Sequence, residues 1–502
     1  MSVLHRVDYK KLTLVLTCSL ITLLFFVFAF YSYPVPAGDS QFFIVPAVEF
    51  AKEGILSSPL FPSEWAIDSV IDSSGARRFL FYPPLFPLVT SYLMPAATPQ
   101  GAFFSLALMN SVVIWLSALL FYRVATYRWP LLNWSKVFLI VLALLALASS
   151  LGETGRPEVL ARIWVVLAAL AAFYASKKYD WAYYGLLFGF LFATHPAGGI
   201  FSLLLLGILF GFRYRFQDIV LRGAAVTLIT FLVSVSIIAL GPFSVQETIG
   251  GTFTNAVVVS YAPSLGTSQW FSLSNLLTYY VFSPVAPFYG FVLLLLVASG
   301  IFFFRRYRSC FASLYISLIS ALILIALFST VAYSAGHALF YASLFASIIF
   351  ALFIRYFLEI GASGKIAVVL LFLLVATGII RSSLLFPFSL KQGVALDDVR
   401  ARFTEVARGS DHDSSFGVTG SFWSLSENYG RMYIYEWPSV PRDGTAFIFF
   451  QQRYSGMLEP PIINGCDLKQ DVFSREVPRF LGVSLGSTMP GYGYAFYQCD
   501  SS

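Results

Sequence analysis

Asp39 is the residue whose type and position most directly indicate chemistry. It follows a strongly apolar segment, residues 12–30, and about 70 residues pass before the next long apolar segment begins. A connection of that length between packed helices usually carries a function. A carboxylate there could act as a general base that takes a proton from a substrate hydroxyl. The alternative is a structural role, because Asp is a favoured N-cap for a helix that starts at Ser40 or Gln41.

Arg156 is the basic residue best placed to bind a phosphate. It lies in the Gly-Arg-Pro-Glu turn of residues 155–158, just before another apolar segment. An arginine side chain holds phosphate oxygens through paired, charge-assisted hydrogen bonds. Glu158 and Arg162 are four residues apart, so they share a helix face and are expected to form a structural ion pair. Arg156 precedes the helix, so we expect it to be the arginine that meets a ligand, with Glu158 orienting Arg156 or the acceptor.

Further polar candidates for substrate binding lie in the first loop and at the ends of apolar segments. The loop contributes Arg77, Arg78 and Tyr82, and two histidines, His195 and His337, end one apolar segment and open another. A single histidine at a helix end is more often a capping or packing residue. Their expected location on the same side of the membrane as Asp39 is what makes these two candidates.

Neither a metal site nor a nucleotide site is defined by spacing. The four histidines are scattered, and the four cysteines form no pair at metal-ligand spacing. Acidic residues of the first loop could bind a divalent ion, but their spacing does not define a site. The sequence has no Gly-rich phosphate-binding loop, Walker lysine or dinucleotide-binding fingerprint. We therefore expect no cofactor.

The elements that would position these residues are membrane helices. Hydrophobic residues make up 58% of the 502 residues and charged residues only 12%, which is typical of a polytopic α-helical membrane protein. The formal net charge of +6 does not indicate nucleic-acid binding, because the basic residues lie in short loops. About 11 transmembrane helices are expected, at residues 12–30, 101–122, 137–151, 159–174, 181–194, 199–212, 224–240, 276–303, 311–329, 335–354 and 366–385.

The distribution of Lys and Arg predicts the orientation. Alternate loops carry these residues, whereas the long loop of residues 241–275 has none. By the positive-inside rule the N-terminus is cytoplasmic, and an odd number of spans places the first loop and the C-terminus outside. The first segment has no small-residue cleavage site and is expected to remain as an uncleaved anchor. The predicted location is the plasma (inner) membrane.

Two domains are expected. Residues 1–390 form the transmembrane domain, whose outer loop, residues 31–100, carries juxtamembrane helices. Residues 391–502 are richer in charge, lack long apolar runs and alternate short β-like runs with turns, so they predict a soluble extracytoplasmic α/β domain. Cys466 and Cys499 both fall in this exported domain and are expected to form a disulfide.

The expected location also restricts the substrate. An outward-facing enzyme has no ready supply of nucleotide sugars, so an activated sugar would arrive on a lipid carrier. A polyprenyl phosphate leaving group needs cations and hydrogen-bond donors, and an acceptor hydroxyl needs a base. Arg156 and Asp39 are residues of these two types.

Together these features resemble the C-type (GT-C) membrane glycosyltransferases, particularly the protein O-mannosyltransferase and lipid A aminoarabinose transferase group. Four stretches match in order within residues 1–385: Gly38-Asp39, Tyr82-Pro83-Pro84-Leu85-Phe86, Arg156-Pro157-Glu158 and Gly336-His337. The resemblance implies a GT-C fold, Asp39 as the catalytic base, a polyprenyl-phosphate-linked sugar donor and inversion of the anomeric centre.

The sequence departs from the family pattern at three places. Ser40 follows Asp39 where relatives often have Glu, and Tyr82 stands where they often have Lys or His before Pro-Pro. The Arg-Tyr pair that commonly follows the late histidine is replaced by residues 338–341, Ala-Leu-Phe-Tyr. Phosphate binding is therefore expected to depend on Arg156, Arg77 or Arg78.

The sequence thus predicts a membrane glycosyltransferase acting on an acceptor lipid, glycan or protein at the outer side of the membrane. The alternative from another class is a multi-span transporter or flippase of a lipid-linked glycan. Transporters concentrate ionisable groups near the membrane midplane and often show interrupted helices in related halves; the predicted spans show little of either. A third hypothesis is an inactive scaffold that acts through its C-terminal domain.

Overall fold

The computed structural model describes part of the chain. The described residues are 8–31, 41–54, 56, 83–126, 131–150, 157–174, 178–195, 216–239, 246, 401, 405, 415–418, 431–434, 446–451, 460, 462–472, 479–480, 483–484 and 494–499. Five of the predicted membrane segments lie outside these residues, namely 199–212, 276–303, 311–329, 335–354 and 366–385. The same is true of Asp39, Arg77, Arg78, Tyr82, Arg156 and His337.

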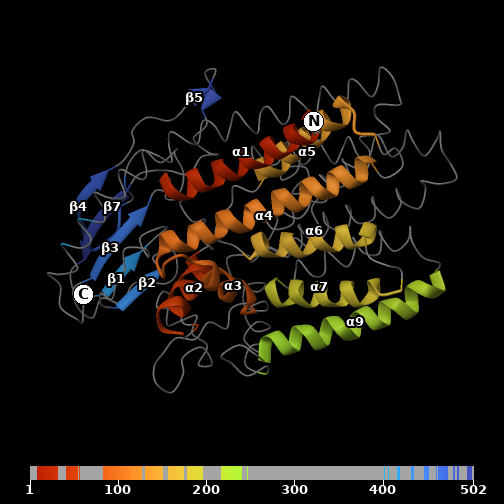
Figure 1. Ribbon diagram of the computed structural model, residues 1–502. Coiled ribbons are helices and arrows are strands. Elements are labelled where there is room, and N and C mark those ends of the chain that lie inside the picture. Colours follow the sequence, from red (N-terminus) through yellow and green to blue (C-terminus); the bar gives the residue numbers. More distant parts are fainter. Residues whose placement is uncertain are drawn as a thin grey trace. The chain divides into compact units, whose positions relative to one another are not determined.

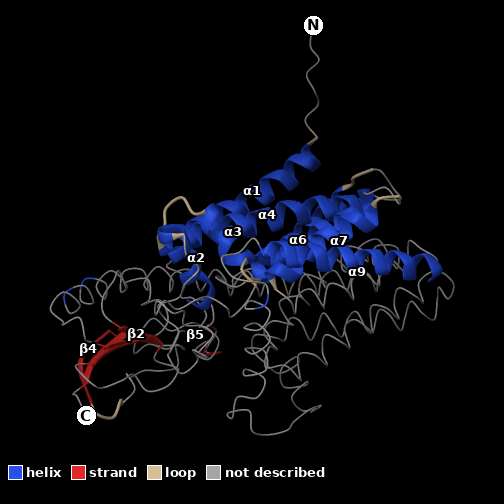
Figure 2. Cartoon of the chain, turned by 90° about the horizontal axis from the view of Figure 1, so that it is seen from below, coloured by secondary structure: helices blue, strands red, loops and turns tan. Residues whose placement is uncertain are grey.

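Helices account for most of the described chain (Figures 1 and 2). They are α1 (Tyr9–Tyr31), α2 (Gln41–Glu53), α3 (Leu85–Leu93), α4 (Pro99–Thr126), α5 (Trp134–Ser150), α6 (Glu158–Tyr174), α7 (Asp180–Thr194) and α9 (Phe216–Ala239). Within the described residues, three stretches are long and apolar enough to cross a membrane: Tyr9–Val27, Gln100–Arg123 and Leu221–Ala239. They favour a helical membrane protein, and the predicted total of about 11 spans stays a prediction.

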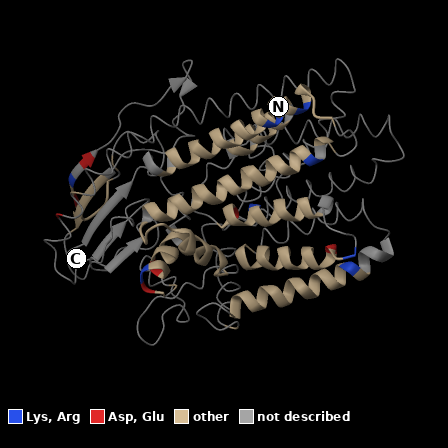
Figure 3. Cartoon of the chain, in the orientation of Figure 1, with Lys and Arg blue, Asp and Glu red and all other residues tan. Residues whose placement is uncertain are grey.

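Charged residues lie within the first or last two turns of the described apolar helices (Figure 3). Lys10 and Lys11 open α1, and Arg123 lies in the last turn of α4. The middle of each of these helices is free of charge, as the cost of placing an ion in hydrocarbon requires.

The helices α7 and α9 form a closely packed pair. Gly185 and Gly189 lie one turn apart on α7, and a Cβ added at Gly185 would lie 2.6 Å from the Ile229 side chain. A Cβ at Gly189 would meet Val233 in the same way. Two small residues four apart let helix backbones approach in a membrane.

Hydrogen bonds and one ion pair add to this packing. The hydroxyl groups of Thr230 and Ser234 donate to the carbonyl oxygens of Gly185 and Gly189, at 3.3 and 3.2 Å. At the start of α7, the fully buried Asp180 carboxylate accepts a hydrogen bond of 2.9 Å from Arg222 of α9. The contacts at these three levels fix the position of α7 along α9.

The first loop contains a packed pair of helices, α2 and α3. Phe43, Ile44, Val45, Ala47 and Val48 of α2 are all buried, so this part of the helix is covered on every side, whereas its last turn is exposed. Its C-terminal end is closed by Gly54, which has φ +73° and donates its N–H to the Phe50 carbonyl at 2.8 Å. A glycine in the left-handed conformation is the usual residue at this position.

The described C-terminal residues form a mixed sheet. Its strands are β1 (Ser415–Val418), β2 (Arg431–Ile434), β3 (Ala446–Gln451), β4 (Cys466–Val472) and β7 (Tyr494–Cys499), in the order β2-β1-β3-β7-β4. Strand β1 runs parallel to β2 and β3, whereas β7 is antiparallel to β3 and β4. Two short strands, β5 (Arg479–Phe480) and β6 (Val483–Ser484), pair separately. The helical part of the predicted α/β domain stays a prediction.

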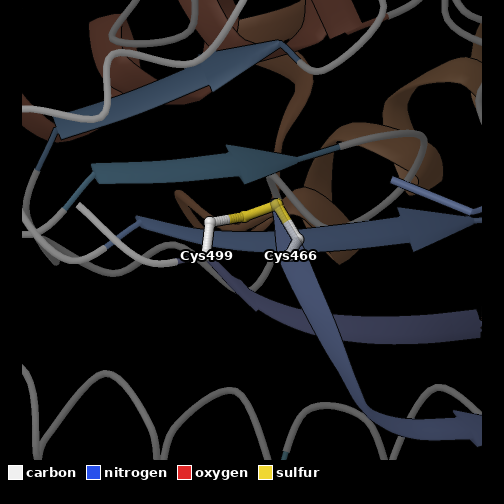
Figure 4. The surroundings of a disulfide bond; sticks show 2 residues. All are labelled: Cys466 and Cys499. Atoms are coloured by element: carbon white, nitrogen blue, oxygen red, sulfur yellow. A yellow bond between two sulfur atoms is a disulfide. The ribbon is translucent and has the colours of Figure 1, made fainter. Parts of the chain in front are cut away.

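The disulfide between Cys466 and Cys499 joins two neighbouring strands of this sheet (Figure 4). The two cysteines lie directly opposite each other in the antiparallel register of β4 and β7. The disulfide predicted from the sequence is confirmed, and the register explains how the two cysteines meet. The bond fastens the edge strand β4 to the sheet.

Candidate functional site

The start of α6 and the end of α7 bring two of the candidate residues together. Helix α6 begins at Glu158, directly after Pro157, whose carbonyl accepts the Ala161 N–H at 3.0 Å. Proline is favoured in the first turn because its missing N–H is not needed there. Helix α7 ends at Thr194, and His195 is its C-cap, with an extended backbone and its N–H donating to Leu191 at 2.8 Å.

Glu158 and His195 are neighbours in a buried site. The distance from Glu158 Oε1 to His195 Nε2 is 4.0 Å, and the two side chains are 1% and 2% exposed. Arg162, one turn further along α6, is completely buried as well. The predicted ion pair of Glu158 with Arg162 stays a prediction, whereas His195 is a neighbour of Glu158 that chain spacing could not reveal.

A second set of contacts fixes α6 against α7 beside this cluster. The indole N–H of Trp164 donates to the Thr194 hydroxyl at 3.0 Å, and this hydroxyl donates to the Phe190 carbonyl at 2.7 Å. The rings of Trp164 and Phe190 stack with their centroids 4.9 Å apart. Because Thr194 directly precedes His195, these contacts hold the imidazole next to Glu158.

Trp164 and Thr194 were not identified from the sequence. The available signal was weak: a hydroxyl residue before His195-Pro196 and an aromatic residue in the second turn of the facing helix. Both are common in membrane helices, so neither would single out a site.

In the first loop, the helix that follows the Gly38-Asp39 motif contacts the helix that follows Pro83-Pro84. Helix α2 begins at Gln41, two residues after Asp39, and α3 begins at Leu85, directly after Pro83-Pro84. Phe43 of α2 and the fully buried Phe86 of α3 meet edge to face, with their centroids 6.2 Å apart. Phe50 and Tyr92 make a similar contact at 6.1 Å. The chain next to Asp39 is therefore tied to the chain next to Tyr82.

Glu49 is the described acid of this loop with a perturbed ionisation. It lies on α2 just after the buried stretch and is itself half-buried. Burial raises the pKa of the Glu49 carboxyl above its ordinary value; Lys52 lowers it and Glu53 raises it, with smaller effects than burial. The neutral acid is thus favoured more than in water.

The structure relates the candidates only in part. It brings Glu158 and His195 together, whereas Asp39, Arg77, Arg78, Tyr82, Arg156 and His337 lie outside the described residues. In the part of the chain that the structure describes, no three His, Cys, Asp or Glu side chains are grouped as metal ligands. A divalent ion stays an open expectation for the first loop.

Comparison with known proteins gives no match: neither a protein-family model nor a curated protein matches this chain.

Proposed function

We propose that this protein is an integral membrane glycosyltransferase. It moves a sugar from a polyprenyl-phosphate carrier to a lipid, glycan or protein acceptor at the extracytoplasmic side of the membrane. The single observation that best supports the proposal is the packing of α2 on α3. The contact of Phe43 with Phe86 gives the long first loop a core at the point where the chain leaves Asp39. A loop with its own core can hold a catalytic carboxylate in a fixed position.

In this mechanism the reaction is a single displacement at the anomeric carbon. Asp39 takes the proton from the acceptor hydroxyl while the acceptor oxygen forms a bond to the anomeric carbon. The bond from that carbon to the phosphate oxygen breaks, and the electron pair leaves with the polyprenyl phosphate. Attack opposite to the leaving group inverts the configuration of the sugar.

The leaving group carries more negative charge in the transition state than in the intact donor. Arg156 is assigned to this charge, with Arg77 and Arg78 as further cations and Tyr82 as a hydrogen-bond donor. Preorganised cations of this kind stabilise a developing charge without reorganisation. His337 is assigned to the donor side by resemblance alone.

Glu158 and His195 are assigned to positioning. Arg156 lies two residues before Glu158, so the turn that carries Arg156 leads directly into the helix whose first residue contacts His195. The stacking of Trp164 on Phe190 holds this helix end in place. A rigid α6–α7 end would keep the Arg156 turn from moving away when the donor binds.

Incubation of purified protein with a panel of polyprenyl-phosphate sugars tests the proposal. A glycosyltransferase releases free polyprenyl phosphate and labels an added acceptor. A flippase, reconstituted in vesicles, moves the lipid-linked sugar across the bilayer and leaves the sugar–phosphate bond intact. Failure to cleave any donor in the panel, together with transport in vesicles, would contradict the glycosyltransferase proposal and show that the protein is a transporter.

A further inference from the structure

The outer face of α3 is apolar, the reverse of what a helix at a water-exposed surface shows. Phe86, Pro87, Thr90 and Ser91 form its buried face, so two hydroxyl residues point inward. The other face carries Leu85, Leu88, Val89, Tyr92 and Leu93, with Tyr92 79% exposed and Leu93 37% exposed. A helix at a water surface places polar residues on its outer face. An apolar outer face indicates contact with lipid.

The apolar surface continues into the connection between α3 and α4, residues 94–98, here termed the α3–α4 corner. Pro95 and Ala96 are exposed there. Sequence supports the same conclusion, because no charged residue occurs between Arg78 and Arg123. A water-exposed connection of a soluble protein would normally carry polar or charged residues.

The α3–α4 corner is held in shape by its own hydrogen bonds. The Met94 N–H donates to the Ser91 carbonyl at 3.2 Å, and the Thr98 N–H donates to the Ala96 carbonyl at 2.8 Å. Thr98 then caps α4, since its hydroxyl accepts the Gly101 N–H at 3.1 Å. Gly101 also permits the close approach of the Ala96 carbonyl, which a Cβ would block. The α3–α4 corner therefore has a defined conformation that does not depend on a partner.

Two candidate membrane spans locate the corner at the membrane boundary. One candidate span ends at Val27 of α1, and another begins at Gln100, two residues after the corner. The Gln100 side-chain amide donates to the Ala29 carbonyl at 3.5 Å, and the rings of Phe26 and Phe104 lie 4.9 Å apart. The outer end of α1 and the start of α4 therefore lie side by side, at the level where both spans leave the hydrocarbon.

We infer that the outer face of α3 and the α3–α4 corner insert into the lipid bilayer, at the boundary between headgroups and acyl chains. Helix α3 has 9 residues and a length of about 14 Å, far short of the roughly 30 Å hydrocarbon core. It is therefore an interfacial helix, which buries its apolar face about 5–10 Å deep. Insertion would fix the height of the first loop above the membrane, because α2 packs on the inner face of α3.

A fluorescence experiment on the full chain in nanodiscs tests this inference without measuring activity. In a background with Cys18→Ala and Cys310→Ser, Tyr92→Cys and Leu93→Cys are each labelled with a polarity-sensitive NBD dye. Leu93→Cys is a second site in case loss of the Tyr92 ring contact with Phe50 disturbs folding. Phe231→Cys, 61% exposed within a candidate span, is the lipid control, and Lys469→Cys on β4 is the water control.

We expect blue-shifted emission at positions 92 and 93, quenching by lipids with a nitroxide near the headgroup end of the acyl chain, and loss of quenching by aqueous iodide. Iodide quenching equal to that at position 469 would overturn the inference. Protection from iodide without quenching by nitroxide lipids would also overturn it, because a protein and not lipid would then cover the surface. Neither result depends on the proposed sugar transfer.

Discussion

Glu158 and His195 lie 4.0 Å apart at the end of the α6–α7 pair, with both side chains almost completely buried. The carboxylate belongs to the first turn of α6 and the imidazole to the C-cap of α7. The distance exceeds that of a hydrogen bond, so the coupling between the two groups is mainly electrostatic. Their burial makes this coupling stronger than at a surface.

A double-mutant cycle measures this coupling. Glu158→Gln and His195→Gln should each lower the free energy of unfolding, and the double variant should differ from their sum by about 0.5–3 kcal/mol. Unfolding of purified protein by denaturant gives the values. Glu53→Gln, an exposed carboxylate on α2, is the matched control and should be nearly silent. Strict additivity would show that Glu158 and His195 act independently.

Gly185 and Gly189 should not tolerate even a methyl group. Gly185→Ala places a Cβ 2.6 Å from Ile229, and Gly189→Ala meets Val233, so α7 and α9 must separate. Overpacking of this kind costs about 1–3 kcal/mol. Thermal unfolding of the purified variants should show lower melting temperatures.

Gly223→Ala on α9 is the control for the two α7 glycines. No atom lies within 4 Å of a Cβ at this position, so the substitution meets open space. Alanine is favoured over glycine in a helix by about 1 kcal/mol, and Gly223→Ala should be neutral or stabilising. Equal destabilisation by all three substitutions would show that helix packing is not the cause.

The sequence was sufficient for the positions of several elements. The Pro157-Glu158 turn, the helix start after Asp39 and the β-like runs near residues 445 and 492 were all predicted within a few residues of α6, α2, β3 and β7. These features depend on local preferences, such as proline in a first turn and alternating apolar residues.

The contacts between elements could not be predicted. The approach of His195 to Glu158, the contact of Phe43 with Phe86 and the fit of Gly185 against Ile229 all depend on which face each helix turns to its neighbour. Most membrane helices carry apolar side chains on all of their faces, so hydrophobic periodicity does not identify the face that packs against a neighbour. The candidate site was therefore predicted as residue types and not as a geometry.

The raised pKa of Glu49 predicts how stability changes with pH. The folded protein binds the Glu49 proton more tightly than the unfolded chain does, because the charged form is half-buried. This contribution to stability is complete below the unfolded pKa of about 4.3 and is lost as pH rises through the raised pKa of Glu49. Glu49→Gln should therefore become more stable relative to wild type as pH rises, in melting curves recorded from acid to neutral pH. A difference that does not change with pH would contradict this account.

The proposed topology predicts opposite locations for two reporter positions. Reporter fusions after Arg128 should report the cytoplasm, because the loop that holds Arg128 is basic, and fusions after Lys391 should report the extracytoplasmic side. A pair of fluorescent and alkaline phosphatase reporters distinguishes the two compartments. Identical results at both positions would show that the number of spans between them is not as predicted.

Turnover of Asp39→Asn with a polyprenyl-phosphate sugar tests the central claim most directly. Asparagine keeps the size of the side chain and caps helices about as well as aspartate, so the melting temperature should barely change. Loss of the base should lower turnover by roughly two to four orders of magnitude. Asp39→Ala, measured in parallel, should lose the same activity and about 1 kcal/mol of stability. Transfer by purified Asp39→Asn at a rate near that of the wild-type protein would contradict the proposed mechanism.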